Sequence, residues 1–155
     1  MAPRDPATDD RLELRDLAYR YARAADRRDY EAFRSIFTED GRVAGFPDPS
    51  TDHAPLYEMI GHDQICGGMQ GLERYSTTFH TVHNQLVEID GDAAHGETYC
   101  IAHHLYDQDG VQMNYTMFIR YQDRYQRTAD GWRIRERLLF LDFGRHAPVG
   151  TNPDH

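Results

Sequence analysis

Cysteine is scarce in this chain of 155 residues: only Cys66 and Cys100 occur, and neither belongs to a C-x-x-C pair. A disulfide framework or a thiolate zinc site is therefore not expected, and a reducing compartment is the default. Long apolar runs are also missing, since no stretch approaches the length needed to span a bilayer. The first ten residues are polar and contain proline, unlike a signal peptide. These absences predict a cytoplasmic protein.

Basic residues are also fewer than acidic residues. The chain has 17 Lys and Arg and 26 Asp and Glu, which gives a formal net charge of −9. A surface of this sign repels nucleic acid and anionic membranes, so neither is expected as a partner. The chain has no glycine-rich phosphate loop, no G-x-S-x-G elbow and no dinucleotide-binding fingerprint. The enzyme classes that those motifs define are therefore not indicated.

No metal site is predicted, although nine histidines are present. The obvious group is His80, His83, His103 and His104, but no H-E-x-x-H motif occurs. Neighbouring residues on a strand point to opposite faces, so His103 and His104 cannot easily share one ion. Cys100 lies near these histidines, but nothing indicates an activated thiol.

The length and composition suit one globular domain, with 39% hydrophobic and 28% charged residues. We expect a disordered leader over residues 1–9, a single domain over 10–145 and a disordered tail over 146–155. Aromatic residues make up 12% of the chain, which suits a deep apolar pocket but equally suits any β-rich core.

The N-terminal third is predicted to be helical. Asp10 followed by Glu13 resembles a capping box, and apolar residues at helical spacing follow it. This helix is predicted to end near Asp26, and Asp29 to begin a second short helix. An aspartate at such a junction is ordinarily a solvated corner or a cap for the next helix, and the local sequence leaves that reading open.

The rest of the chain has mainly strand character. Short strands are predicted at 42–46 and 56–60, and the glycine-interrupted segment 61–75 reads as a broken helix or a mobile lid. Four longer runs alternate as strands do: 78–89, 93–106, 112–126 and 132–140. Asp-Gly pairs at 90–91, 109–110 and 130–131 predict tight turns between them. The expected fold is α+β, with a curved antiparallel meander wrapped around the helices.

The first long strand carries the most informative residues. His80, Val82, Asn84 and Leu86 are predicted to share one face, because side chains alternate with period two. A histidine beside aliphatic residues is either a titratable group in an apolar pocket or a half-buried structural residue, and these residues alone do not decide between the two.

Several short motifs together resemble the SnoaL-like branch of the NTF2-like superfamily, over roughly residues 10–145. The motifs are Tyr21, Asp26, the T-x-H-x-x-x-N of 78–84, the Asp-Gly-Asp turn of 90–92, the Y-Q-D-R-Y of 121–125 and the G-W-R-I-R-E-R of 131–137. The resemblance implies a cone-shaped fold with an internal apolar cavity. It also implies chemistry like that of scytalone dehydratase, bile-acid 7α-dehydratase and hexachlorocyclohexane dehydrochlorinase.

The resemblance implies a catalytic pair. Asp26 matches the aspartate that follows the first helix in those enzymes, and His80 matches their histidine because it stands four residues before Asn84. His83 is the competitor, but it misses this spacing and alternates to the other face. Such a carboxylate would fix the tautomer of the imidazole and stabilise the imidazolium formed on proton abstraction.

Other site residues follow from the same resemblance. Tyr21 and Arg137 match catalytic or polarising positions in relatives. Tyr99 stands near a second histidine of the scytalone enzyme, and Ile119 and Tyr121 replace its water-binding serine and asparagine, so scytalone is not the expected substrate. The expected substrate-binding residues are Asn84, Tyr99, Met117, Ile119 and Tyr121.

The expected function is a cofactor-independent lyase or isomerase acting on a hydrophobic, hydroxylated or carbonyl-bearing small molecule. The alternatives are a polyketide cyclase, an epoxide hydrolase or a non-catalytic ligand-binding or structural subunit of the same fold. No metal or organic cofactor is expected, and the resemblance implies a homodimer or homotrimer.

Two arguments disagree on which face of the sheet the side chain of Arg137 occupies. Strict alternation with Trp132 and Ile134 in the core would turn Arg137 toward solvent. The resemblance places it in the cavity, which requires a bulge or twist between Ile134 and Arg137. We expect Arg137 on the cavity side, together with His80.

Overall fold

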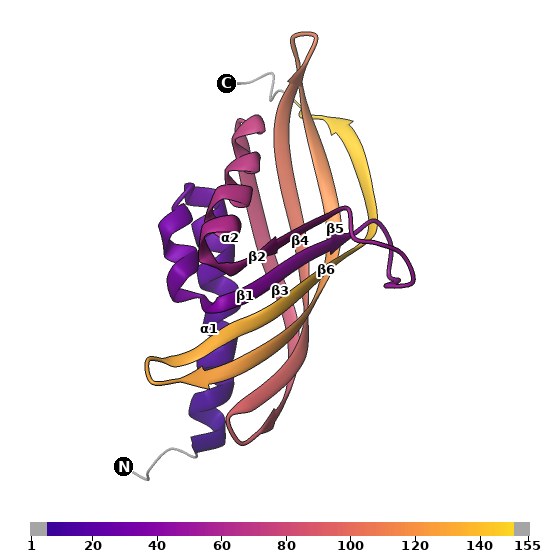
Figure 1. The fold of residues 1–155 in the computed structure, drawn as a ribbon. Helices are drawn as coiled ribbons and strands as arrows, with labels where there is room; N and C mark the ends of the chain where they lie inside the picture. The colour runs from indigo at the N-terminus through magenta and orange to yellow at the C-terminus, as the bar shows by residue number, and fades with distance from the viewer. Residues whose placement is uncertain (1–5, 151–155) are drawn as a thin grey trace, which may run out of the picture.

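The computed structural model describes residues 6–150. Four helical elements are present: α1 (Pro6–Arg27), η1 (Tyr30–Ser35), α2 (Gly61–Met69) and η2 (Gln70–Arg74). Six strands complete the fold: β1 (Phe37–Phe46), β2 (Tyr57–Ile60), β3 (Thr77–Asp90), β4 (Ala93–Gln108), β5 (Val111–Thr128) and β6 (Gly131–Pro148). The helices gather on one side of a strongly curved sheet (Figure 1).

All six strands belong to one sheet, in the order β2-β1-β6-β5-β4-β3. The predicted meander of three hairpins is confirmed, because β3, β4, β5 and β6 pair antiparallel with their sequence neighbours. Strand β1 lies outside this meander and pairs parallel with β6, a pairing that the sequence did not predict. The chain between them is long enough for such a crossover, and β1 thereby extends the sheet beside the last strand.

The core lies between α1 and the inner face of the sheet. Leu14, Leu17, Tyr21 and Ala25 recur at helical spacing and are almost fully buried. They pack against inner-face residues such as Trp132, which has no exposed surface. Burial of this apolar stripe, rather than helix propensity, fixes α1 on the sheet.

The N-terminal capping box is not formed. Helix α1 begins at Pro6, so residues 6–9 of the predicted leader are helical, whereas residues 1–5 lie outside the described part of the chain. The Asp10 carboxylate accepts hydrogen bonds from Trp132 Nε1 at 3.0 Å and from Arg127 at 2.8 and 2.6 Å. Glu13 accepts the backbone N–H of Trp132 at 2.8 Å. These carboxylates attach the helix to β5 and β6 instead of capping it.

Other boundaries also differ from expectation. The segment predicted as a broken helix or lid is α2 followed directly by η2, so the broken-helix alternative describes it. Strand β6 continues to Pro148, so residues 146–148 of the predicted tail are strand, and residues 151–155 lie outside the described part. Within residues 6–150, no helix combines the length and apolar character needed to cross a membrane.

Candidate active site

The end of α1 and the start of β3 bring together the two residues predicted as a catalytic pair. His80 Nδ1 lies 2.7 Å from Asp26 Oδ1, and the backbone N–H of His80 donates to Asp26 Oδ2 at 2.9 Å. Because the carboxylate can only accept, the imidazole carries its proton on Nδ1 and leaves Nε2 as the basic nitrogen. The predicted contact is present, while the catalytic roles of the two residues stay predictions.

The environment keeps Asp26 ionised. Partial burial favours the neutral acid, but hydrogen bonds from the His80 ring, the His80 backbone and Thr78 outweigh it and lower the pKa of Asp26. The side chain of His80 is 7% exposed and that of Asp26 is 21% exposed. The pair is thus largely screened from water, and Asp26 is the more exposed of the two residues.

A bulge in β3 decides which residues beyond Val82 share the inner face with His80. The pairing with β4 shifts between Val82 and Gln85, so two residues of β3, His83 and Asn84, lie opposite one residue of β4. His80 and Val82 therefore share the inner face with Gln85 rather than with Asn84. The prediction that Asn84 and Leu86 share the face of His80 is wrong, since both are exposed on the outer side. A one-residue insertion reverses the facing of everything beyond it.

A second bulge, in β6, turns Arg137 inward. The pairing with β5 shifts between Arg124 and Tyr125, which pair with Glu136 and Ile134, so Arg135 is the extra residue. Arg137 consequently joins Ile134 on the inner face and has no exposed surface. The prediction that a bulge between Ile134 and Arg137 reverses the facing is confirmed.

Arg137 is held by a buried ion pair. Its Nε and Nη2 each donate to Asp123 at 2.8 Å, and its guanidinium lies 4.2 Å from the ring centroids of both Tyr21 and Tyr121. Burial alone would lower the pKa of Arg137, but the carboxylate of Asp123 more than offsets this and raises it. The third nitrogen, Nη1, is buried without a hydrogen-bond partner. Arg137 therefore stays cationic and keeps one donor unused.

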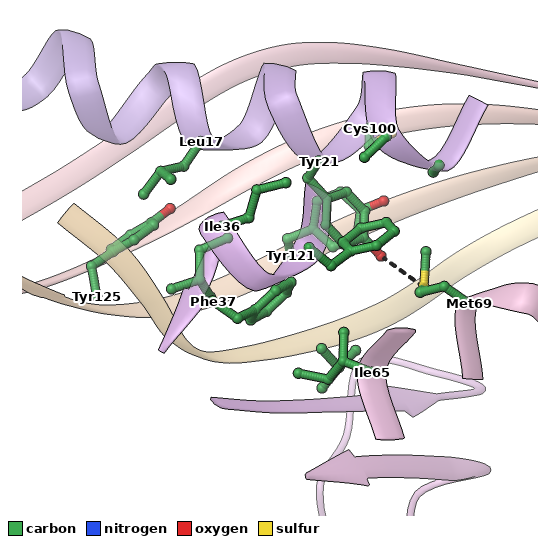
Figure 2. Close-up of a cluster of buried hydrophobic side chains, with 14 of the residues drawn as sticks. Leu17, Tyr21, Ile36, Phe37, Ile65, Met69, Cys100, Tyr121 and Tyr125 are labelled. Atoms are coloured by element: carbon green, nitrogen blue, oxygen red, sulfur yellow. Dashed lines mark hydrogen bonds between the residues drawn. The ribbon is translucent and has the colours of Figure 1, made fainter. Parts of the chain in front are cut away.

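Tyr21 and Tyr121 stand side by side beneath Cys100 in the packed interior (Figure 2). Burial raises the pKa of each phenol, so both remain protonated donors. The hydroxyl of Tyr21 lies 4.0 Å from Met69 Sδ, which is a weak acceptor. Tyr21 thus has no strong acceptor in that direction, and its proton is available to another group.

The remaining predicted binding residues divide between the two faces. Ile119 belongs to the buried core cluster with Tyr21 and Tyr121, and Met117 packs against that cluster. Tyr99 is 40% exposed on the outer face, where Arg120 lies over its ring at 5.8 Å. The prediction that Tyr99 shares a cavity with His80 is therefore wrong. Alternation along β4 explains the error, because Thr98 and Cys100 take the inward positions.

A SnoaL-like domain matches residues 6–138, most of the chain. The chain belongs to the SnoaL-like family. A Mycobacterium tuberculosis protein is 30% identical to it over 131 residues, which are 83% of each chain. A candidate scytalone dehydratase from Novosphingobium aromaticivorans superposes with a TM-score of 0.72 at 18% identity, over 94% of this chain and 93% of that one. A hexachlorocyclohexane dehydrochlorinase superposes with a TM-score of 0.75 at 14% identity, over 93% and 91%. The predicted family and the NTF2-like α+β fold are both confirmed.

Sequence reasoning missed one residue of this SnoaL-like site, His104. Its ring centroid lies 5.6 Å from that of His80 and 4.7 Å from that of Tyr75, and the residue is 4% exposed. Burial, together with the nearby charge of His80, lowers the pKa of His104 to about 4, so the ring is neutral at physiological pH. The alternation of buried Cys100 and Ala102 along β4 was a signal that His104 faces inward.

Two depressions of the SnoaL-like domain lie apart from the pair. An open groove of about 1830 Å³ follows the N-terminal half of α1 and the β3–β4 hairpin. A depression of about 310 Å³ lies on the outer face and is lined by His83, Asn84 and Tyr99, among others. Over residues 6–150, no three side chains of His, Cys, Asp or Glu gather as metal ligands. The absence of a metal or cofactor stays a prediction.

Proposed function

We propose that this protein is a cofactor-independent lyase of the dehydratase type, acting on a hydrophobic small molecule that carries a hydroxyl group and a carbonyl group. The observation that carries the proposal is the 2.7 Å contact between His80 Nδ1 and Asp26, screened from water and backed by the second contact from the His80 backbone. A surface ion pair would not need two separate donors to one carboxylate.

The geometry supports His80 Nε2 as the general base. It would remove a proton from the carbon next to the carbonyl, and the C–H electron pair would form the new double bond. The bond from the neighbouring carbon to the hydroxyl oxygen then breaks, and the imidazolium returns the proton to that oxygen, so water leaves. Asp26 remains ionised and stabilises the imidazolium between the two steps. Proton return to carbon instead would give an isomerase from the same pair.

Tyr21 and Arg137 are the proposed polarising groups. Arg137 lies on the inner face of the sheet, and Tyr21 lies on the side of α1 that packs against it. One is cationic and the other a protonated phenol, and each has a donor without a strong acceptor. Such donors stabilise the negative charge that develops on a carbonyl oxygen, most effectively where water is excluded. With Arg137 neutralised by Asp123, the ionised Asp26 leaves a net negative charge inside the site, which supports an uncharged substrate.

The structure also bears on two of the alternatives. An epoxide hydrolase of this fold would require two carboxylates and an arginine around one water. Here the Asp123 carboxylate is paired with Arg137, and the Asp26 carboxylate is paired with His80, so neither is free to activate a water molecule. A structural subunit would have no use for the aspartate–histidine contact. Both observations support the lyase over these alternatives.

The test is a turnover assay with a panel of bicyclic β-hydroxyketones in deuterated water. The wild type should form the conjugated enone, followed by its ultraviolet absorbance, and exchange of the α-proton should be visible by NMR. His80→Gln should lower both rates by about 10² to 10⁴-fold, the usual contribution of positioned proton transfer. The melting temperature should change little, because the inner position stays filled.

His95→Gln is the matched control, since His95 contacts only a carboxylate on the exposed β3–β4 hairpin. It should keep the full rate. Equal rates for His80→Gln and His95→Gln would rule out His80 as the base. Proton exchange without enone formation would indicate the isomerase instead.

A further inference from the structure

The residue that ends α1 is unusual for its position. The backbone N–H of Asp29 donates to Ala24 O at 3.0 Å, and that of Arg28 reaches Ala25 O at 3.4 Å, which is the Schellman pattern of helix termination. The residue in the left-handed position of this motif is usually glycine. Here it is Arg28, with φ of 58°. A residue with a Cβ costs about 1 kcal/mol more than glycine there, which draws attention to the contacts of its side chain.

The side chain of Arg28 makes three hydrogen bonds beside the proposed site. Its Nη1 donates to Ala25 O at 2.8 Å and to Thr78 Oγ1 at 2.7 Å, and its Nη2 donates to Tyr75 O at 3.2 Å. Thr78 is 3% exposed and stands on β3 two residues before His80, on the same face. The guanidinium thus joins the end of the first helix to the strand that carries the histidine.

These contacts constrain the Thr78 hydroxyl. A threonine hydroxyl has one proton to donate, and its oxygen here accepts from Arg28. The positive guanidinium lies against this oxygen, so the hydroxyl proton points away from Arg28. The carboxylate of Asp26 is the acceptor proposed for this proton, beside the two donors from His80, because the Thr78 side chain helps to lower the pKa of Asp26 and shares its face with His80.

We infer that Arg28 is a positioning residue for the Asp26–His80 pair and acts through the Thr78 hydroxyl. The chain of donors runs from Arg28 to Thr78, from Thr78 to Asp26, and from His80 to the same carboxylate. It fixes the orientation of Asp26 and keeps it ionised while His80 takes up a proton. The catalytic role of these linked hydrogen bonds rests on the proposed function, but the hydrogen bonds themselves do not depend on it.

The test measures the carboxyl titration of Asp26 by ¹³C NMR on the full chain, so it needs no substrate. Arg28→Gly suits the left-handed backbone and removes only the side chain. Thr78→Val removes the hydroxyl at nearly constant volume, and Thr78→Ser keeps it. Arg28→Gly and Thr78→Val should each raise the proton affinity of Asp26 by about tenfold, the scale of one hydrogen bond to a charged group. Thr78→Ser should resemble the wild type.

The double variant Arg28→Gly with Thr78→Val decides between a relay and a simple charge effect. If Arg28 acts through Thr78, the double variant should show no larger change than Thr78→Val alone. Arg27→Gln removes the same charge one residue away and should leave the titration unchanged. An Arg28→Gly effect that persists undiminished in the Thr78→Val background would overturn the inference. So would an unchanged Asp26 titration in Arg28→Gly accompanied only by a lower melting temperature.

The outcome is independent of the turnover assay. If His80→Gln loses the dehydratase activity while Arg28→Gly leaves the Asp26 titration unaltered, the lyase proposal stands and the relay is rejected. The reverse pattern would retain the relay as a structural device and reject the lyase.

Discussion

At the scale of single residues, the neutral His104 links the site to pH-dependent stability. Its pKa of about 4 in the folded protein lies below the ordinary value of 6.5 expected in the unfolded chain. Between these values the unfolded state binds a proton that the folded state does not. The free energy of unfolding is therefore unaffected by His104 above about pH 6.5 and falls as the pH drops from 6.5 to 4.

We expect His104→Phe to remove this dependence. The loss of stability attributable to His104 across that window is about 3 kcal/mol at most, from a pKa difference of this size. Urea unfolding at a series of pH values should show a shallower slope for His104→Phe than for the wild type. Protonation of Asp26 also lowers the free energy of unfolding as the pH falls, but only at lower pH, because its pKa lies below 3.8. His103→Phe, on the outer face, is the control; an identical slope in all three proteins would contradict the assignment to His104.

At the scale of elements, the bulge in β6 controls the interior charge. Arg135 is exposed and is the extra residue that turns Arg137 toward Asp123. Deleting Arg135 should keep Arg137 on the inner face, because Ile134, Glu136 and Arg137 then alternate without the extra residue. Arg137→Met instead leaves the Asp123 carboxylate buried without its cation, and losing one partner of a buried ion pair costs about 3–5 kcal/mol. Arg137→Met should lower the free energy of unfolding in urea by that amount.

Arg135→Ala is the control for the loss of one arginine. It removes only an exposed group, so its stability should stay within about 0.5 kcal/mol of the wild type. Equal stability of Arg137→Met and Arg135→Ala would show that the buried ion pair with Asp123 does not stabilise the fold.

At the scale of the whole molecule, the outer face of the sheet is unusually apolar. Phe79 and Phe143 are 62% and 60% exposed on this face, and Phe143 stacks on Phe118 at 4.2 Å. Exposed aromatic groups of this kind mark association surfaces in soluble proteins. We expect a homo-oligomer that buries the outer face, as the family resemblance also suggests.

Light scattering at micromolar concentration should give a mass above that of the 18.0 kDa chain. Phe143→Arg should reduce it to the monomer mass, since an arginine directly on a buried interface is strongly unfavourable. Leu56→Arg adds the same charge to an exposed site outside the strands and should leave the oligomer intact. A monomeric wild type would contradict the prediction.

The sequence by itself determined the features that depend on local chemistry. Asp-Gly turns between alternating runs required a four-strand meander, and helical spacing required the first helix with Asp26 at its end. The spacing of His80 from the turn, through the family resemblance, was enough to pair it with Asp26. These signals lie within a few residues of one another, so no tertiary information was needed.

Only the tertiary structure decided which side chains face the site. Asn84 and Arg137 both depart from simple alternation because a bulge exists only in the pairing of two strands. Asp10 has the sequence of a helix cap, but the buried Trp132 indole offers its carboxylate a donor from a residue far along the chain. Nothing in the sequence singles out Arg28, because its contact with Thr78 arises only when the helix end and the strand meet. Local patterns specify the elements, and the contacts between elements specify the site.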